Sequence, residues 1–183
     1  TDATIIRYDA DTRQITDAWS YVDQSQNSAI IFDVSPQGDV FLLSMDKASD
    51  LFSIWKMNAT GQNEQVFQNA NTKYGHILNY QWFQSMHWIQ TTNGILRITG
   101  DGKNFNLYSF SQVLPTNTYV AYAGEHYYFY DQSSRAVMYW DSKMDSPKRY
   151  TTIPAKVQVS SGQFIVRDEM LYLANGYYFF ILD

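Results

Sequence analysis

The chain contains no cysteine, which excludes a disulfide framework, a zinc–thiolate site and a thiol nucleophile. It also has no run of lysine or arginine, and 13 basic residues against 18 acidic ones give a net charge of −5. Nucleic-acid binding through phosphate neutralisation is therefore not expected. No stretch approaches the roughly 18 apolar residues that a membrane-spanning helix needs, so we expect no membrane insertion.

Aromatic side chains are abundant: 15 Tyr, 11 Phe and 5 Trp make up 17% of the 183 residues. Aromatic residues are enriched in β-strands. Short apolar runs bounded by Gly, Pro, Asn and Asp follow one another along the chain, and no segment sustains a helical period. The sequence therefore predicts an all-β protein.

A unit of similar length recurs along the chain. Residues 56–63 and 97–104 share the pattern basic-x4-Gly-x-Asn, and they begin 97 − 56 = 41 residues apart. Weaker copies follow at 139–141 and 181–183, each 42 residues further on. A period of roughly 40–45 residues with four short strands per unit is typical of β-propeller blades. We therefore predict a β-propeller of about four blades, each a four-stranded antiparallel sheet, as a partial or small ring.

We expect one propeller domain, or a fragment of one, over residues 1–183, with the strands of each blade called a to d in chain order. Two Asn-Gly pairs, at 93–94 and 175–176, predict tight b-to-c hairpin turns because both central residues of such turns need positive φ. The triplet at 36–38, Pro-Gln-Gly, predicts an a-to-b turn. The expected segments are a c–d hairpin at 4–19 and blades at about 29–68, 77–110, 119–152 and 164–182.

The expected strands do not close into a ring, because c-type strands outnumber the other three types by one. Three closures stay open: a compact four-bladed ring with a spare strand, a fragment lacking further blades, and a half-ring completed by a second copy. A β-sandwich with meander topology is the alternative outside the propeller class. The chain begins at Thr1 without a charged-then-apolar leader, so we expect either a removed signal or a piece of a longer protein.

Three segments resemble a YWTD-type propeller blade: 86–90 (MHWIQ), 94–98 (GILRI) and 101–104 (DGKN). That family pairs an aromatic b strand with a c strand reading Ile-x-Arg, followed by an Asp-Gly turn. Related bacterial repeats are matched more loosely by residues 53–61. The Tyr-Trp-Thr-Asp string itself is absent, and Pro147 stands where the third copy should have Gly. The resemblance implies the fold and says little about activity.

Metal or acid–base chemistry would require histidines to converge with carboxylates. We interpret His76, His87 and His126 as partly buried rings with satisfied hydrogen bonds, of which only His76 approaches the expected central channel. Acidic residues near predicted loops are interpreted as solvated turn residues: Asp23, Asp33, Asp46, Asp50, Asp131 and Glu169.

The expected inner strands carry mostly neutral side chains, such as Asn79 and Gln81, which argues against a propeller hydrolase or lactonase with a channel calcium. Residues 99–105 loosely resemble the Asp-box turn of sialidase-type propellers, which is structural even in enzymes. We therefore predict no enzyme activity, no catalytic residue, no metal site and no cofactor.

Aromatic residues at loop edges are the best functional lead. The d-to-a and b-to-c loops of a propeller share one face, and loops on a rigid scaffold often carry recognition. Tyr and Trp are enriched at protein interfaces. We predict a non-catalytic protein-binding module; a carbohydrate-binding propeller is the second hypothesis and a calcium-dependent hydrolase or lactonase the third. The candidate binding residues are Trp19, Tyr21, Tyr74, His76, Trp82 and Tyr177.

The richness in Asn, Gln, Ser and Tyr favours a secreted or cell-envelope protein. The triplet Asn58-Ala59-Thr60 is an N-glycosylation sequon on an expected exposed turn, a pattern that also arises often by chance.

Overall fold

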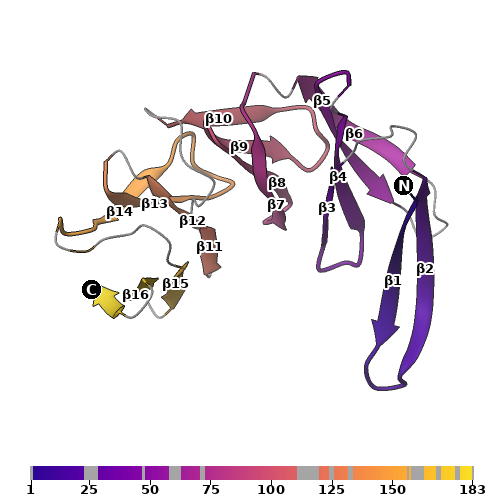
Figure 1. The fold of residues 1–183 in the computed structure, drawn as a ribbon, viewed down its shortest axis with the longest axis horizontal. Coiled ribbons are helices and arrows are strands. Elements are labelled where there is room, and N and C mark those ends of the chain that lie inside the picture. Colours follow the sequence, from indigo (N-terminus) through magenta and orange to yellow (C-terminus); the bar gives the residue numbers. More distant parts are fainter. Residues whose placement is uncertain are drawn as a thin grey trace. The chain divides into compact units, whose positions relative to one another are not determined.

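In the computed structural model, every regular element among the described residues is a β-strand (Figure 1). No helix in the described part of the chain is long and apolar enough to cross a membrane. The described residues are 2–22, 29–46, 48–57, 63–70, 73–110, 120–123, 126–131, 134–155, 157, 163–167, 170–175 and 178–182. The sequon at Asn58 and the acids Asp23 and Glu169 lie outside them.

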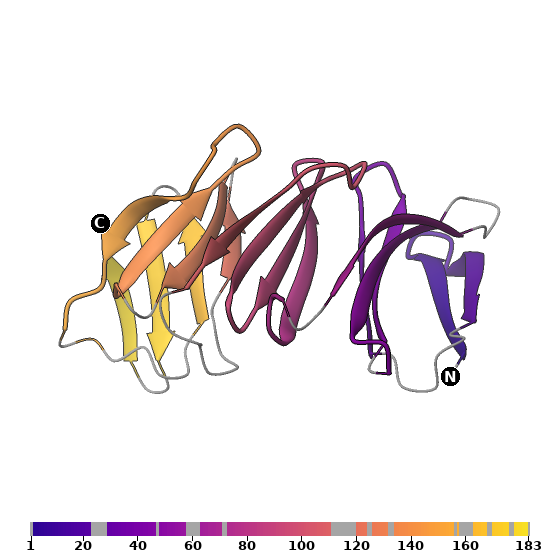
Figure 2. The same cartoon turned by 90° about the horizontal axis from the view of Figure 1, so that it is seen from above.

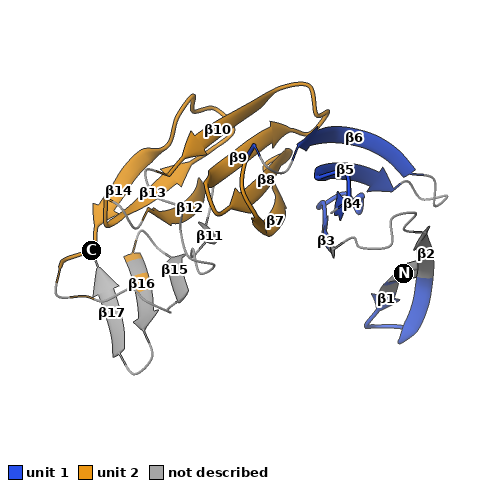
Figure 3. Ribbon diagram, turned by 45° about the horizontal axis from the view of Figure 1, so that its top comes forward, with its two compact units in different colours: residues 1–73 blue, residues 74–183 orange. Residues whose placement is uncertain are grey.

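The chain divides into two compact units, Thr1–Lys73 and Tyr74–Asp183, each described here by itself (Figure 3). Unit 1 holds a two-stranded sheet and a four-stranded sheet, both antiparallel. That the whole chain is one domain stays a prediction. The strands of unit 1 are β1 (Asp2–Asp9), β2 (Gln14–Val22), β3 (Ala29–Val34), β4 (Val40–Asp46), β5 (Leu51–Met57) and β6 (Asn63–Ala70).

Unit 2 holds two four-stranded sheets and one three-stranded sheet, all antiparallel with neighbours in chain order. We call β3–β6 blade one, β7–β10 blade two and β11–β14 blade three. The predicted all-β class built of four-stranded antiparallel sheets is confirmed. The strands of unit 2 are β7 (Ile77–Phe83), β8 (Met86–Thr91), β9 (Gly94–Thr99), β10 (Phe105–Ser109), β11 (Val120–Ala123), β12 (His126–Asp131), β13 (Ala136–Trp140), β14 (Lys148–Thr152), β15 (Gln163–Arg167), β16 (Met170–Asn175) and β17 (Tyr178–Leu182).

The core of unit 2 lies between blades two and three, which stand side by side in Figures 1 and 2. Trp88 of β8 stacks on Tyr127 of β12 with ring centroids 4.5 Å apart, and Trp140 of β13 meets Trp88 edge-on at 5.5 Å. These three side chains are essentially fully buried. Both faces of a b strand are covered in such a stack, which is why β8 and β12 read as continuous apolar and aromatic runs.

The turn predicted at residues 36–38 is confirmed. Gly38 donates its N–H to the carbonyl of Ser35 at 2.9 Å and has a φ of +86°. The Ser35 hydroxyl also accepts from the N–H of Asp39 at 3.0 Å. This turn joins β3 to β4 and requires glycine because of its positive φ.

The turn predicted at Asn93-Gly94 is wrong in its geometry. Neither residue is among those with positive φ, and the loop is instead organised by the Thr91 hydroxyl, which accepts from the N–H groups of Asn93 and Gly94 at 3.2 and 3.1 Å. Gly94 is needed for a different reason. A Cβ at this position would stand 2.0 Å from the backbone carbonyl oxygen of Tyr108 on β10. The second pair, Asn175-Gly176, is not fully within the described residues.

The two-residue turn with positive φ lies at Gln84-Ser85 instead, where φ is +52° and +57°. It joins β7 to β8 directly after the pair Phe83–Met86. This left-handed geometry is that of a type I′ hairpin, for which Asn and Gly are the preferred residues. The sequence carries no such signal at this position, so the turn could not be predicted from it.

We expect Gly94→Ala to lower the free energy of unfolding by about 2–4 kcal/mol, because the new methyl group would collide with rigid backbone. Asn93→Ala is the matched control and should cost about 1 kcal/mol or less, since φ at Asn93 suits any residue. Urea denaturation followed by tryptophan fluorescence measures both. Equal losses for the two variants would contradict the assignment.

Candidate functional site

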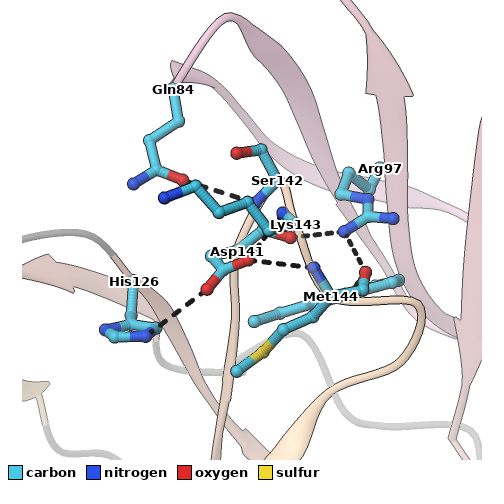
Figure 4. Close-up of polar contacts among 8 residues, drawn as sticks. Gln84, Arg97, His126, Asp141, Ser142, Lys143 and Met144 are labelled. Carbon is cyan, nitrogen blue, oxygen red and sulfur yellow. Dashed lines mark hydrogen bonds and ion pairs between the residues drawn. The ribbon is translucent and has the colours of Figure 1, made fainter.

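A polar cluster of unit 2 lies where blade two meets the loop that follows β13, and Figure 4 shows it. Arg97 of β9 is its centre. The guanidinium donates from Nη1 to the backbone carbonyls of Asp141 and Met144, the latter at 2.6 Å. The same group lies over the Trp140 ring at 4.6 Å from its centroid. One buried arginine side chain thus joins two blades by hydrogen bonds and a cation–π contact.

Arg97 is buried, with 7% of its surface exposed, and this burial lowers the pKa of its guanidinium. The negative charges of Asp141 and Asp145 act in the opposite direction. With its amide oxygen turned towards Arg97, Asn106 accepts from Nη2 at 2.7 Å. A buried cation is tolerated when most of its donors are satisfied in this way.

The loop itself is held from several sides. The Asp141 carboxylate accepts from the N–H groups of Lys143 and Met144 at 2.6 and 3.0 Å, and Trp140 Nε1 donates to the Met144 carbonyl at 3.1 Å. The N–H of Ser142 donates to Gln84 Oε1 at 3.3 Å. Gln84 belongs to the left-handed β7–β8 turn, so this turn of blade two also holds the loop of blade three.

His126 lies beside this loop, with Nε2 3.5 Å from Asp141 Oδ2. Its ring meets Tyr139 edge-on at 4.9 Å. One third of the His126 side chain is exposed, so a protonated imidazole would pair with the carboxylate at the surface. The other contacts of the Asp141 carboxylate are to loop backbone, so the arrangement is suited to fixing the loop rather than to proton transfer.

His87 is fully buried rather than partly buried, and both ring nitrogens have hydrogen-bond partners, as its interpretation as a satisfied ring predicted. The Tyr80 hydroxyl donates to Nδ1 at 2.9 Å, and Nε2–H donates to the Gly100 carbonyl at 3.3 Å, which fixes the tautomer. Burial lowers the pKa of His87 to about 4, so the ring is neutral at pH 7. His76, in contrast, is exposed, and its interpretation as a partly buried ring is wrong.

The interpretation of the acids as solvated turn residues is wrong for Asp131, which is buried. Its carboxylate accepts from the Ser134 hydroxyl at 2.8 Å and from the Tyr108 hydroxyl of blade two at 3.3 Å. Burial and the Asp131 charge raise the pKa of Tyr108. Asp46 accepts from the Ser49 hydroxyl at 2.5 Å, and this bond lowers its pKa. The shared signal, Asp-x-x-Ser, is readable in the sequence but was missed.

The predicted binding residues differ in how far the structure buries their side chains. Tyr74 is fully buried and meets the Phe105 ring edge-on at 6.4 Å, so its prediction as an exposed loop-edge aromatic is wrong. Trp82 is half-buried and packs on His87 with centroids 4.7 Å apart. His76 is exposed before β7. The binding role of His76 and Trp82 stays a prediction.

The structure does not describe the side chains of the remaining predicted binding residues. Trp19 and Tyr21 lie on β2, and their side chains are outside the described residues, as is Tyr177. Among the side chains that the structure does describe, no group of three or more His, Asp or Glu residues could hold a metal ion.

Three of the large apolar side chains that are more than half exposed among the described residues lie on the β1–β2 hairpin: Ile6 (53% exposed), Tyr8 (57%) and Ile15 (59%); Phe32 on β3 is equally exposed at 53%. Tyr8 and Ile15 are directly opposite each other across the two strands, and Ile6 precedes Tyr8 by the two-residue spacing of one strand face; the β1–β2 register shifts between Arg7 and Tyr8. We call these three residues the hairpin face. Unit 1 also exposes Phe32 and Val34 on one face of β3.

No protein-family model and no curated protein sequence matches the chain. Solved structures do match. One is the extracellular domain of BT4673 from B. thetaiotaomicron, described as a hybrid two-component system. Its sequence is 12% identical to this chain and the TM-score is 0.53. The match covers 89% of this chain and 21% of the BT4673 chain. Another is YCF48 bound to a D1 peptide, with 13% sequence identity and a TM-score of 0.56. The match covers 91% of this chain and 53% of the YCF48 chain.

At this identity the similarity shows the fold alone, and the chain spans between a fifth and about half of these structures. The four-stranded antiparallel sheets are blades of a partial β-propeller, as predicted, and not layers of a β-sandwich. The resemblance to YWTD-type blades in particular stays a prediction.

We expect Arg97→Lys to lower the free energy of unfolding by about 2–4 kcal/mol, because an ammonium group cannot reproduce the planar set of donors. Lys103→Ala, which removes a solvent-exposed ion pair with Asp101, is the control and should change little. Urea denaturation of both variants measures the difference. A loss in the lysine variant no larger than in the control would show that Arg97 is not required.

His87 should make the fold sensitive to acid. Its folded pKa of about 4 lies below the ordinary 6.5, so the unfolded chain takes up the proton first as pH falls. The stability contributed by the neutral ring is complete above pH 6.5 and is lost towards pH 4, by about 3 kcal/mol. Denaturation of wild type and His87→Gln at pH 7.5 and 4.5 isolates this effect, because the two proteins share every other titratable group. The same pH dependence in both proteins would refute it.

Proposed function

We propose that this chain is a non-catalytic β-propeller module that binds a protein partner through the hairpin face of unit 1. The exposure of Ile6, Tyr8 and Ile15 on one side of a two-stranded sheet carries the proposal. Three adjoining large apolar side chains, each more than half exposed, favour an interaction surface. Tyrosine in particular combines apolar area with a polar tip and is enriched at protein interfaces.

The structural neighbours support this kind of function without identifying the partner. YCF48 was captured with a peptide bound, and the BT4673 domain is extracellular. Both observations fit a binding role for the present chain, and we propose an extracellular or envelope location for it, in line with its composition.

The proposed binding surface, the hairpin face, differs from the loop face predicted from the sequence. Tyr74 is part of the core and cannot present its ring to a partner in this fold. The exposed His76 remains available on the loop before β7. A carbohydrate ligand and a calcium-dependent hydrolase stay untested hypotheses, and no described residue favours either of them.

Affinity capture with the 183-residue chain as bait tests the proposal. The bait is incubated with extract of the source organism, and bound proteins are quantified by mass spectrometry. A specific partner should be enriched by wild type and lost, by about tenfold or more, with the triple variant Ile6→Lys/Tyr8→Lys/Ile15→Lys.

The control bait is Phe105→Lys/Leu107→Lys, which changes exposed apolar residues of β10 in unit 2. It should retain the partner. Equal retention by the triple variant, or equal loss with the control, would refute the hairpin face as the binding surface. Thermal melts of all three proteins ensure that folding is unchanged.

A further inference from the structure

The pair Asn93-Gly94, where β8 passes into β9, has a reactivity that needs no ligand and no enzyme. The backbone nitrogen that follows an asparagine can attack the side-chain amide, and glycine favours this because it has no Cβ to hinder the approach. The Gly94 nitrogen would bond to Cγ of Asn93 while the bond from Cγ to Nδ2 breaks. Ammonia leaves with the proton of the Gly94 N–H, and a succinimide ring remains. Water then opens either carbonyl of the ring, which gives aspartate or isoaspartate.

In the folded chain the attacking nitrogen is held in place. The N–H groups of Gly94 and Asn93 donate to the Thr91 hydroxyl at 3.1 and 3.2 Å. The same hydroxyl donates to the Gly94 carbonyl at 3.1 Å. Thr91 is only 1% exposed, so these three hydrogen bonds are made away from competing water.

The amide that would be attacked is held as well. Oδ1 of Asn93 accepts from the Thr92 hydroxyl at 3.3 Å, and Cγ packs against Gly75 so closely that a Cβ there would stand 2.7 Å from it. The Asn93 carbonyl accepts from the N–H of Phe110 at 2.8 Å. The peptide plane between Asn93 and Gly94 is therefore bonded through both its carbonyl and its N–H, and attack on Cγ requires this rigid plane to turn.

We propose that Asn93 is a modification site that the fold closes and that opening of the β8–β9 turn exposes to deamidation. Its rate then follows the fraction of time for which the turn is open, as in other local unfolding equilibria. The inference concerns unit 2 alone and does not depend on the hairpin face.

Isoaspartate at position 93 would prevent the turn from forming again. Its main chain runs through the former side chain and is one carbon atom longer. Gly94 has no room for such a displacement, because a Cβ at this position would already overlap the carbonyl oxygen of Tyr108. The carbonyl that accepts from Phe110 would also no longer belong to the main chain. Prolonged opening of blade two thus becomes irreversible.

Peptide mapping of the full chain by mass spectrometry tests the site. The chain is kept for weeks at neutral pH, either folded or in concentrated guanidinium chloride. Deamidation of Asn93 should be about tenfold or more slower in the folded chain. Asn175, which also precedes glycine, supplies the reference rate in denaturant. Equal rates at Asn93 in both conditions, or a denatured rate far below that of Asn175, overturn the proposal.

The Thr91 hydroxyl is the element to remove. Thr91→Val should raise the rate at Asn93 in the folded chain about tenfold or more. Thr91→Ser keeps a hydroxyl and should remain close to wild type, so it keeps the test decisive if the valine variant does not fold. A serine variant as fast as the denatured chain would refute the role of this hydroxyl.

Thr99→Val is the matched control, because it removes the hydroxyl that closes the c–d turn of the same blade. It should leave Asn93 as slow as in wild type. Equal acceleration by Thr91→Val and Thr99→Val would show that general destabilisation of the blade opens the site, which contradicts control by the β8–β9 turn.

Refolding tests the consequence. Chains aged in denaturant are diluted into buffer, and the recovery of native tryptophan fluorescence is compared with the isoaspartate content at position 93. Recovery should fall as isoaspartate accumulates. Asn93→Ala, aged in the same way, should recover to a clearly higher yield, since only damage elsewhere remains. Equal yields for the two proteins, or full recovery of chains that carry isoaspartate at 93, would overturn the block to refolding.

Discussion

Unit 2 depends on one buried cation. The Arg97 guanidinium satisfies backbone carbonyls of a loop from the next blade and lies over the ring of Trp140, so hydrogen bonding and aromatic packing converge on one side chain. A buried charge without such partners would cost several kcal/mol. The loop in turn is shaped by Asp141 and held by Gln84, so the positions of blades two and three depend on the same small network.

The blades are built on repeated turns rather than on repeated core residues. The Asp-x-x-Ser/Thr turn closes hairpins in both units, because a carboxylate that accepts local N–H and O–H donors holds the chain in the same bend each time. The b–c turn of blade two is built differently: the Thr91 hydroxyl accepts from the N–H of Gly94, and the Tyr108 carbonyl oxygen of β10 lies close to Gly94. The variation explains why the blade period is clear in the sequence while its individual motifs are weak.

The polar groups of unit 2 and the apolar surface of unit 1 have different roles. His87, Asp131 and Arg97 hold strands and loops together from buried positions, and burial is the main cause of the lowered pKa of His87 and of Arg97. The hairpin face has no comparable internal role among the described contacts. We therefore propose the hairpin face as the binding surface in place of Tyr74, which the fold buries.

The sequence by itself determined the all-β class and the blade-like sheets, because strand alternation, a 41–42-residue period and turn residues are local properties that survive any tertiary context. It predicted the Pro36–Gly38 turn for the same reason. Only the tertiary structure decided that Tyr74 is buried, that Asp131 is not solvated, and that Gly94 is required by a carbonyl of β10 rather than by its own φ. Each of these depends on which distant strand arrives beside the residue, and no local pattern encodes that contact.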